Sequence, residues 1–283
     1  MQVKHAAANY KVPSDPNDRL PRARVYRAGP EPQQVGAPGA TPAVLTYIAL
    51  HYWAGAGHEF NDLRSQLPAG TPLLAPDLPG FGAQEAPAGF DYSVKAYTDW
   101  VADLLVAHKL EEYVLIGHSM GGKIALALAA RQPAGLRGLV LLSPSPPTPE
   151  PISDEDRAAS LAAYGQRLEA EKTATKIMIR PVSAAVRQEV IADNLRTSQA
   201  AWNAWLEHGS KEDISALMPN IQVPCCLLVG DADHAIPLAA QQQQTLPLLP
   251  AGSPLVVVPG AGHLLPLEAP DMVREAVLKI TAA

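Results

Sequence analysis

Cysteine is almost absent from this chain of 283 residues, and the little that is present cannot form a disulfide framework. The two cysteines, Cys225 and Cys226, are adjacent and lie inside an apolar run. We interpret them as two buried thiols, because neighbouring cysteines are a poor structural staple. Such cysteine use fits a reducing compartment, and we expect a cytoplasmic protein.

Long hydrophobic runs and dense basic clusters are also missing. The amino-terminal stretch MQVKHAAANYKVPSDP contains no apolar core of signal-peptide length. No run reaches the roughly 18 apolar residues that a membrane-spanning helix needs. The formal net charge is −6, which gives no electrostatic footprint for nucleic acid. The sequence therefore predicts neither a membrane nor a nucleic-acid partner, and it leaves the oligomeric state open.

Motifs for metals and nucleotide cofactors are missing as well. No group of His, Asp, Glu or Cys residues has the spacing of a metal site. No glycine-rich phosphate-binding loop follows an expected strand. We therefore expect no metal and no cofactor.

The sequence does contain a repeated alternation of short apolar runs and helical patterns. Strands that alternate with helices predict the α/β class, with a mostly parallel central sheet flanked by helices. The amino-terminal region, rich in proline and polar residues, offers only one possible strand, at Arg24–Arg27. The main expected elements are strands at 43–50, 71–75, 113–116, 139–142, 224–229 and 254–258, and helices at 60–67, 93–110, 120–131 and 270–279.

The alternation is interrupted once, between residues 146 and 219. This segment opens with the proline cluster SPSPPTPEP, and mostly helical patterns follow at 152–171, 184–194 and 199–208. Ligands of parallel α/β sheets bind beyond the carboxyl ends of the strands. We therefore predict a core formed by residues 1–145 and 220–283, and an inserted helical cap at 146–219 that covers those strand ends.

One serine stands at an expected junction between a strand and a helix, in the stretch GHSMGG. Ser119 has a glycine two positions before it and another two positions after it, which lets the chain turn sharply and project the side chain. A glycine-rich turn with a capping serine would leave the same pattern. A serine hydroxyl becomes a useful nucleophile only when a base lies within hydrogen-bond reach.

Candidates for that base and its supporting acid follow two later strands. LLVGDADH ends a strand with Asp231 and Asp233, and VVVPGAGH ends another with His263. Serine, acid and histidine in this chain order are expected for a nucleophile elbow in a parallel sheet. Because each group follows the carboxyl end of a strand, all of them can converge at one edge of the sheet.

These motifs resemble those of the α/β-hydrolases, in particular small serine esterases, lactonases and cofactor-free haloperoxidases. The resemblance rests on GHSMGG, DLPGFG, LLVGDADHAIP and GAGHLLPLEAPD, and it covers about residues 40–145 and 220–283. It implies that Ser119 is the nucleophile and His263 the base. The acid of the family stands three residues after the glycine that ends the strand, which implies Asp233 rather than Asp231.

The loop after the first buried strand departs from the family pattern. The family usually has His-Gly-x there, and the backbone N–H of x is one donor of the oxyanion hole. This chain has His51-Tyr52-Trp53. We expect the backbone N–H groups of Trp53 and Met120 to form the oxyanion hole. The alternative is that the loop shifts and Tyr52 supplies a donor.

Aromatic residues are the candidates for the substrate pocket. Trp202 and Trp205 lie three positions apart on an expected cap helix, where they either pack the cap or line the pocket, and Tyr52 is a third candidate. The resemblance implies a carboxylic ester hydrolase that cleaves small or medium esters or lactones through an acyl-enzyme on Ser119. The same triad would also serve a C–C bond hydrolase or a cofactor-free perhydrolase. A ligand-binding receptor with slow turnover is a further alternative.

Overall fold

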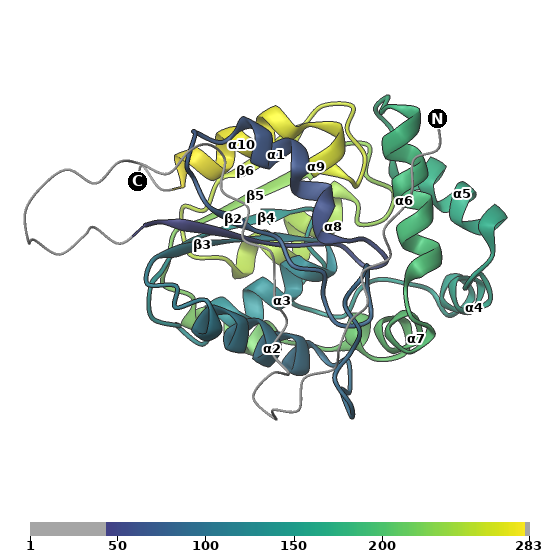
Figure 1. Cartoon of the computed structure of the whole chain (residues 1–283), viewed down its shortest axis with the longest axis horizontal. Coiled ribbons are helices and arrows are strands. Elements are labelled where there is room, and N and C mark those ends of the chain that lie inside the picture. The colour runs from purple at the N-terminus through teal and green to yellow at the C-terminus, as the bar shows by residue number, and fades with distance from the viewer. Residues whose placement is uncertain (1–43, 281–283) are drawn as a thin grey trace, which may run out of the picture.

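A parallel six-stranded sheet occupies the centre of the computed structural model, which describes residues 44–280 (Figure 1). The strand suggested at Arg24–Arg27 lies outside the described residues. The strand order is β2-β1-β3-β4-β5-β6, and every neighbouring pair in it is parallel. The predicted α/β class is confirmed. The strands are β1 (Thr46–Leu50), β2 (Leu73–Leu74), β3 (Tyr113–His118), β4 (Leu136–Leu142), β5 (Cys225–Gly230) and β6 (Leu255–Val258).

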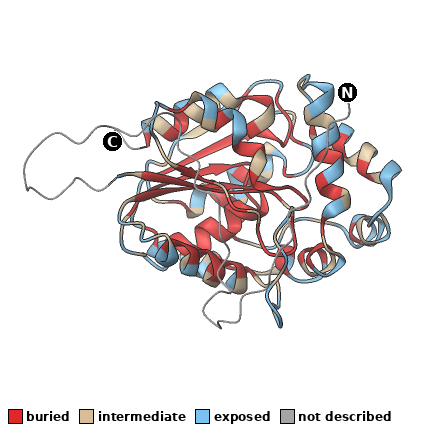
Figure 2. Cartoon of the chain, in the orientation of Figure 1, coloured by how far each residue is buried: buried red, intermediate tan, exposed pale blue. Residues whose placement is uncertain are grey.

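Helices cover both faces of the sheet, and the strands between them are mostly buried, apart from the partly exposed edge strand β6 (Figures 1 and 2). One face carries α1 (Asn61–Gln66), α9 (Leu265–Glu268) and α10 (Pro270–Lys279), and the other carries α2 (Val94–Ala107) and α3 (Met120–Ala129). Side chains alternate along a strand. In β3, Val114 and Ile116 therefore join the core cluster beneath α1 and α10, while Leu115 joins the cluster beneath α2 and α3. Because the strands are buried on both faces, their sequences are continuous apolar runs.

Local capping signals place the start of α2 where the sequence predicted it. Ser93 is the N-cap residue, and its hydroxyl accepts a hydrogen bond of 3.0 Å from the backbone N–H of Ala96. A short helix, α8 (Leu238–Ala240), and irregular helical turns connect β5 to β6. Within residues 44–280, no helix combines the length and the apolar character needed to cross a bilayer.

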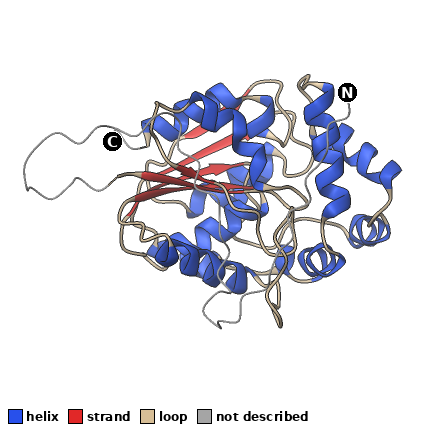
Figure 3. Cartoon of the chain, in the orientation of Figure 1, coloured by secondary structure: helices blue, strands red, loops and turns tan. Residues whose placement is uncertain are grey.

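Residues 146–219, here called the cap segment, contain helices but no strand (Figure 3). The helical pattern at 152–171 divides into two helices, because Gly165 interrupts it with a φ of +70°. The cap segment contacts loops that follow the strands: Ser198 N donates to Gly80 O after β2, and His263 N donates to Ile177 O after β6. Its helices are α4 (Asp154–Ala162), α5 (Arg167–Ile177), α6 (Ala184–Arg196) and α7 (Gln199–Glu207).

Candidate active site

Ser119 occupies a strained turn between β3 and α3. Its backbone has φ 51° and ψ −117°, a conformation that residues other than glycine rarely adopt. Gly121 allows this turn to press against the loop after β1: a Cβ there would lie 2.3 Å from the carbonyl oxygen of Leu50. The Gly121 N–H also donates to His51 O at 3.2 Å. The glycines of GHSMGG thus hold the serine against the neighbouring strand end.

His263 and Asp233 form a buried pair. His263 Nδ1 lies 2.8 Å from Asp233 Oδ2, and the other oxygen of Asp233 accepts the backbone N–H groups of Ala235 and Ile236 at 2.8 and 3.0 Å. Asp231 faces away, because its carboxylate accepts the N–H of Gly260 at 2.6 Å. The structure therefore brings Asp233, and not Asp231, to the histidine.

The charges of this pair favour a carboxylate next to a protonated Nδ1. Burial by itself would lower the pKa of His263, but the Asp233 carboxylate raises it above the ordinary value, with further contributions from Glu150 and Glu59. Burial opposes ionisation of Asp233, yet the His263 side chain and two backbone donors lower its pKa. Because Nδ1 donates to Asp233, the neutral ring has its lone pair on Nε2, where it can accept a proton.

His118 links the loop of His263 to the serine turn. It directly precedes Ser119, its Nε2 lies 2.9 Å from the carbonyl oxygen of His263, and its Nδ1 lies 3.1 Å from both oxygens of Glu59. The rings of His118 and His263 have centroids 5.2 Å apart. His263 is therefore held beside the turn that carries Ser119. Glu59 lies in a segment with no recognisable motif, so its place beside His118 could not be predicted from the sequence.

The loop after β1 presents backbone donors beside Ser119. His51 fixes this loop, since its Nδ1 lies 2.7 Å from Tyr52 O and its Nε2 accepts the N–H of Leu78 at 2.9 Å. None of the residues in the range 44–280 accepts a hydrogen bond from the backbone N–H of Trp53 or of Met120. Both N–H groups lie close along the chain to the hydrogen bond that joins Gly121 to His51.

The ring of Tyr52 packs between the turn that carries Ser119 and the cap segment. Its ring lies 5.3 Å from that of His118 and packs with Ala174, Met178 and Leu264, among others. Gly55 makes room for the ring, since a Cβ at that position would lie 2.3 Å from it. Burial raises the pKa of the Tyr52 hydroxyl well above its ordinary value.

The two candidate tryptophans of the cap segment have different surroundings. Trp202 packs on Trp53, with ring centroids 4.2 Å apart, and its Nε1 donates to Ser160 O at 3.1 Å. Trp205 belongs to the main core cluster, together with residues of α2 and α3. Of the two, Trp202 is the one that touches the loop of the candidate oxyanion donors.

A buried lysine and a half-buried glutamate near the site were not predicted from the sequence. Lys123, on the first turn of α3, is fully buried; its Nζ donates to Thr148 O at 3.2 Å, and burial lowers its pKa to about 8. Burial raises the pKa of Glu150, while Lys123, His263 and Arg157 counteract this effect. The Glu150 carboxylate therefore lies within electrostatic reach of His263. A lysine on an alanine-rich helix gives no sequence signal of burial.

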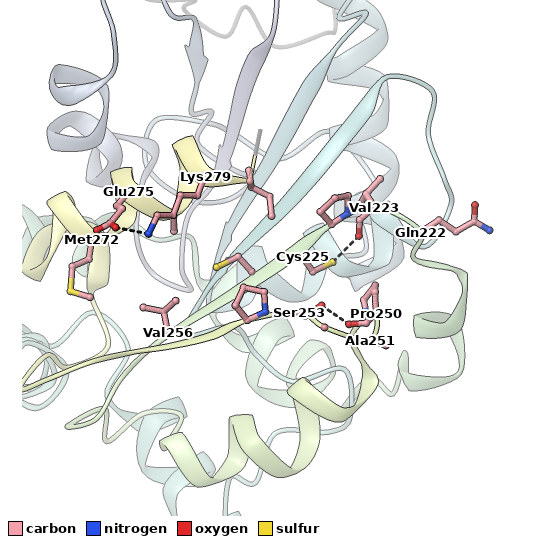
Figure 4. Close-up of a pocket in the computed structure, with 16 residues that line it drawn as sticks. Gln222, Val223, Cys225, Pro250, Ala251, Ser253, Val256, Met272, Glu275 and Lys279 are labelled. Atoms are coloured by element: carbon pink, nitrogen blue, oxygen red, sulfur yellow. Dashed lines mark hydrogen bonds and ion pairs between the residues drawn. The ribbon is translucent and has the colours of Figure 1, made fainter. Parts of the chain in front are cut away.

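A pocket of about 740 Å³ lies elsewhere on the protein, at the amino-terminal ends of β5 and β6 (Figure 4). Its lining includes Cys225, Val256 and Met272, and an exposed ion pair joins Glu275 to Lys279 at its rim. Ser119, Asp233 and His263 follow the opposite, carboxyl ends of their strands. This pocket is therefore separate from the candidate active site.

Comparison with known proteins identifies the family. A family model described as the alpha/beta hydrolase family matches residues 37–276. The chain is 30% identical over 256 residues to a 2-succinyl-6-hydroxy-2,4-cyclohexadiene-1-carboxylate synthase of Enterobacter sp. strain 638, covering 84% of this chain and 92% of the relative. It is also 30% identical over 234 residues to a pimeloyl-[acyl-carrier protein] methyl ester esterase of Neisseria meningitidis, covering 78% and 72%.

A solved structure shows the same fold. The bromoperoxidase of Bacillus anthracis superposes with a TM-score of 0.78 and 18% identity, and the match covers 84% of this chain and 92% of that one. The family match spans most of the sequence, from before β1 into α10. The chain belongs to the alpha/beta hydrolase family and is an enzyme of that superfamily.

Proposed function

We propose that this protein is a serine hydrolase that cleaves small or medium carboxylic esters or lactones through an acyl-enzyme on Ser119. The observation that carries the proposal is the buried hydrogen bond of 2.8 Å between His263 Nδ1 and Asp233 Oδ2, beside a serine held at φ 51°. An esterase among the relatives favours a carboxylic ester as the substrate.

The proposed mechanism uses the protein's own groups in two half-reactions. His263 Nε2 takes the proton of the Ser119 hydroxyl as its oxygen attacks the carbonyl carbon, and the protonated ring then gives that proton to the leaving alcohol. Asp233 holds the ring in the required tautomer and stabilises its charged form. Water activated by His263 then attacks the acyl-enzyme, which releases the acid and restores the serine.

The oxyanion of each tetrahedral intermediate is assigned to two backbone donors. The N–H groups of Trp53 and Met120 suit this role for two reasons. They donate to no acceptor among the described residues, and they lie close along the chain to the hydrogen bond between Gly121 and His51. Fixed donors of this kind stabilise developing negative charge without reorganising during the reaction.

Residues 146–219 are proposed to act as a cap that selects the substrate, over a core of residues 1–145 and 220–283. The cap contributes Trp202, which packs on Trp53 at the candidate oxyanion loop. We propose that Tyr52 lines the pocket from the core side, where it packs with Ala174 and Met178, and that Trp205 supports α7 from the main core cluster. We propose that the enzyme acts in the cytoplasm on a small molecule.

The experiment that tests the proposed function is covalent labelling with an alkyl fluorophosphonate. A serine activated by His263 attacks phosphorus and displaces fluoride, so we expect one adduct per folded chain, located on Ser119 by peptide mapping. Heat-denatured protein is the control and should remain unlabelled. Folded protein that shows no adduct in intact-mass analysis, and hydrolyses no p-nitrophenyl ester, would reject the proposal.

A substitution at Tyr52 tests the assignment of the oxyanion donors. Tyr52→Phe removes only the hydroxyl and leaves the backbone N–H groups in place, so we expect kcat to stay within a few-fold of wild type. Loss of one oxyanion donor typically lowers kcat by about 10²–10³-fold. Steady-state kinetics with p-nitrophenyl acetate measure the difference. A fall of a hundredfold in a correctly folded variant would mean that the Tyr52 hydroxyl is itself a donor.

A further inference from the structure

One buried carboxylate receives four backbone hydrogen bonds next to the candidate base. Glu268, at the end of α9, is 7% exposed. Its Oε2 accepts the N–H groups of Ile179, Arg180 and Gly262 at 2.9, 2.7 and 2.9 Å. Its Oε1 accepts the N–H of Leu264 at 3.0 Å. The carboxylate is therefore an acceptor for all four donors.

The four donors come from two separate parts of the molecule. Gly262 and Leu264 stand on either side of His263, in the loop after β6. Ile179 and Arg180 belong to residues 177–180, the end of α5 and the first part of its connection to α6 in the cap segment, here called the cap linker. Glu268 thus joins the loop of the base to the cap linker.

Direct contacts between the two parts reinforce this connection. The backbone N–H of His263 itself donates to Ile177 O at 2.8 Å. Gly262 fits closely under the linker, since a Cβ there would lie 2.6 Å from Ile177 O. The Arg180 guanidinium donates to the carbonyl oxygens of Glu268 and Pro259. The backbone around His263 is therefore hydrogen-bonded to the cap segment at several adjacent points.

A carboxylate is well suited to this role. It offers about four lone-pair positions and no donor, whereas a protonated acid or an amide places a donor against backbone N–H groups. An unsatisfied buried N–H is unfavourable, so the loop or the linker would move to find another partner. A shift of about 1 Å in a catalytic group can lower the rate by about a hundredfold.

We propose that Glu268 is a positioning residue that fastens the loop of His263 to the cap linker. His263 then keeps its hydrogen bond to Asp233 only while the cap linker holds the position seen in the structure. Glu268 touches no reacting atom and acts through His263. The inference rests on the proposed function for its catalytic consequence. The coupling between the position of the cap linker and the position of the His263 ring can also be measured without turnover.

The test compares Glu268→Gln with the matched control Glu275→Gln. Glu275 is exposed, lies nearby on α10 and pairs only with Lys279 among the described residues. We expect Glu268→Gln to lower kcat by about 10- to 100-fold with KM within threefold, since the substitution removes no side chain that is proposed to bind the substrate. The acid limb of kcat/KM should move to lower pH, because a buried histidine that loses Asp233 has a lower pKa. Glu275→Gln should leave all three quantities unchanged.

A spectroscopic readout separates positioning from general stability. The Nδ1 proton of His263 that bonds to Asp233 should give a far-downfield proton NMR resonance in wild type. We expect Glu268→Gln to lose or broaden that resonance while circular dichroism shows a folded protein. Arg180→Met provides a second arm from the cap side, since it removes the guanidinium donors and leaves the carboxylate in place. It should lower kcat about three- to tenfold and weaken the same resonance.

Each outcome decides the inference. Wild-type values of kcat and an intact resonance in Glu268→Gln would overturn it. A lower kcat with an unchanged resonance and an unchanged acid limb would also overturn it, because the base would then still be in place. If Glu268→Gln does not fold, Arg180→Met decides by the same criteria. Wild-type protein that resists fluorophosphonate rejects the proposed function alone, because the resonance still reports whether Glu268 positions the ring.

Discussion

Replacing Ser119 by alanine is expected to lower kcat by about 10⁴- to 10⁶-fold. The substitution removes the oxygen atom that forms the acyl-enzyme. The members of a catalytic triad act as a unit, so His263 and Asp233 are left without a nucleophile to activate. Steady-state hydrolysis of p-nitrophenyl esters of graded acyl length measures the loss. KM should change little, because the other side chains around Ser119 are retained.

The fold should survive this change, since alanine keeps the Cβ of Ser119 and removes only one oxygen atom from a residue that is 8% exposed. Ser65→Ala is a suitable control: Ser65 lies exposed on α1, where its hydroxyl bonds only to Asp62 O. It should keep wild-type activity. A Ser119→Ala enzyme that retained kcat within tenfold would show that the nucleophile lies elsewhere.

The parts of the site that were predictable depend on short-range signals. Ser119 is flanked by glycines because the turn itself requires them: a Cβ at Gly117 would lie 2.6 Å from Gly122 Cα. Asp233 and His263 each follow an apolar strand and a glycine. In a parallel sheet all carboxyl ends share one edge, so groups distant in the chain could be placed together. The identities of the strands and most helices followed from the same alternation.

The parts that were not predictable depend on contacts between distant segments. Glu268 bonds to Ile179, which lies 89 positions earlier, and Glu59 pairs with His118, 59 positions later. Glu268 lies within the motif GAGHLLPLEAPD, but the motif does not indicate that its carboxylate bonds to the cap segment, and Glu59 lies in a segment with no recognisable motif. Lys123 is buried because the segment after β4 covers it, and helix periodicity alone cannot predict such a contact. Helical spacing likewise could not separate Trp202, which meets Trp53, from Trp205, which enters the core.

The choice between the two acidic residues after β5 has the second largest expected effect. Asp233→Asn should lower kcat by about 10⁴-fold, because an amide beside Nδ1 no longer fixes the tautomer or stabilises the charged ring. Asp231→Asn is the matched control on the same turn. Asp231 bonds to Gly260 N and not to the histidine, so kcat should stay within a few-fold of wild type. Equal losses, or the reverse order, would contradict the assignment of Asp233.

The pH dependence of the same pair provides an independent check. His263 must be neutral to act as a base, and the carboxylate of Asp233 raises its pKa above the ordinary value of about 6.5. In wild type, kcat/KM should therefore fall as the pH drops through a single ionisation above that value. In Asp233→Asn the carboxylate is gone while the burial that lowers the pKa remains, so the residual activity should fall only at a lower pH. Asp231→Asn should keep the wild-type profile. An acid limb that stayed in place in Asp233→Asn would mean that a group other than His263 controls it.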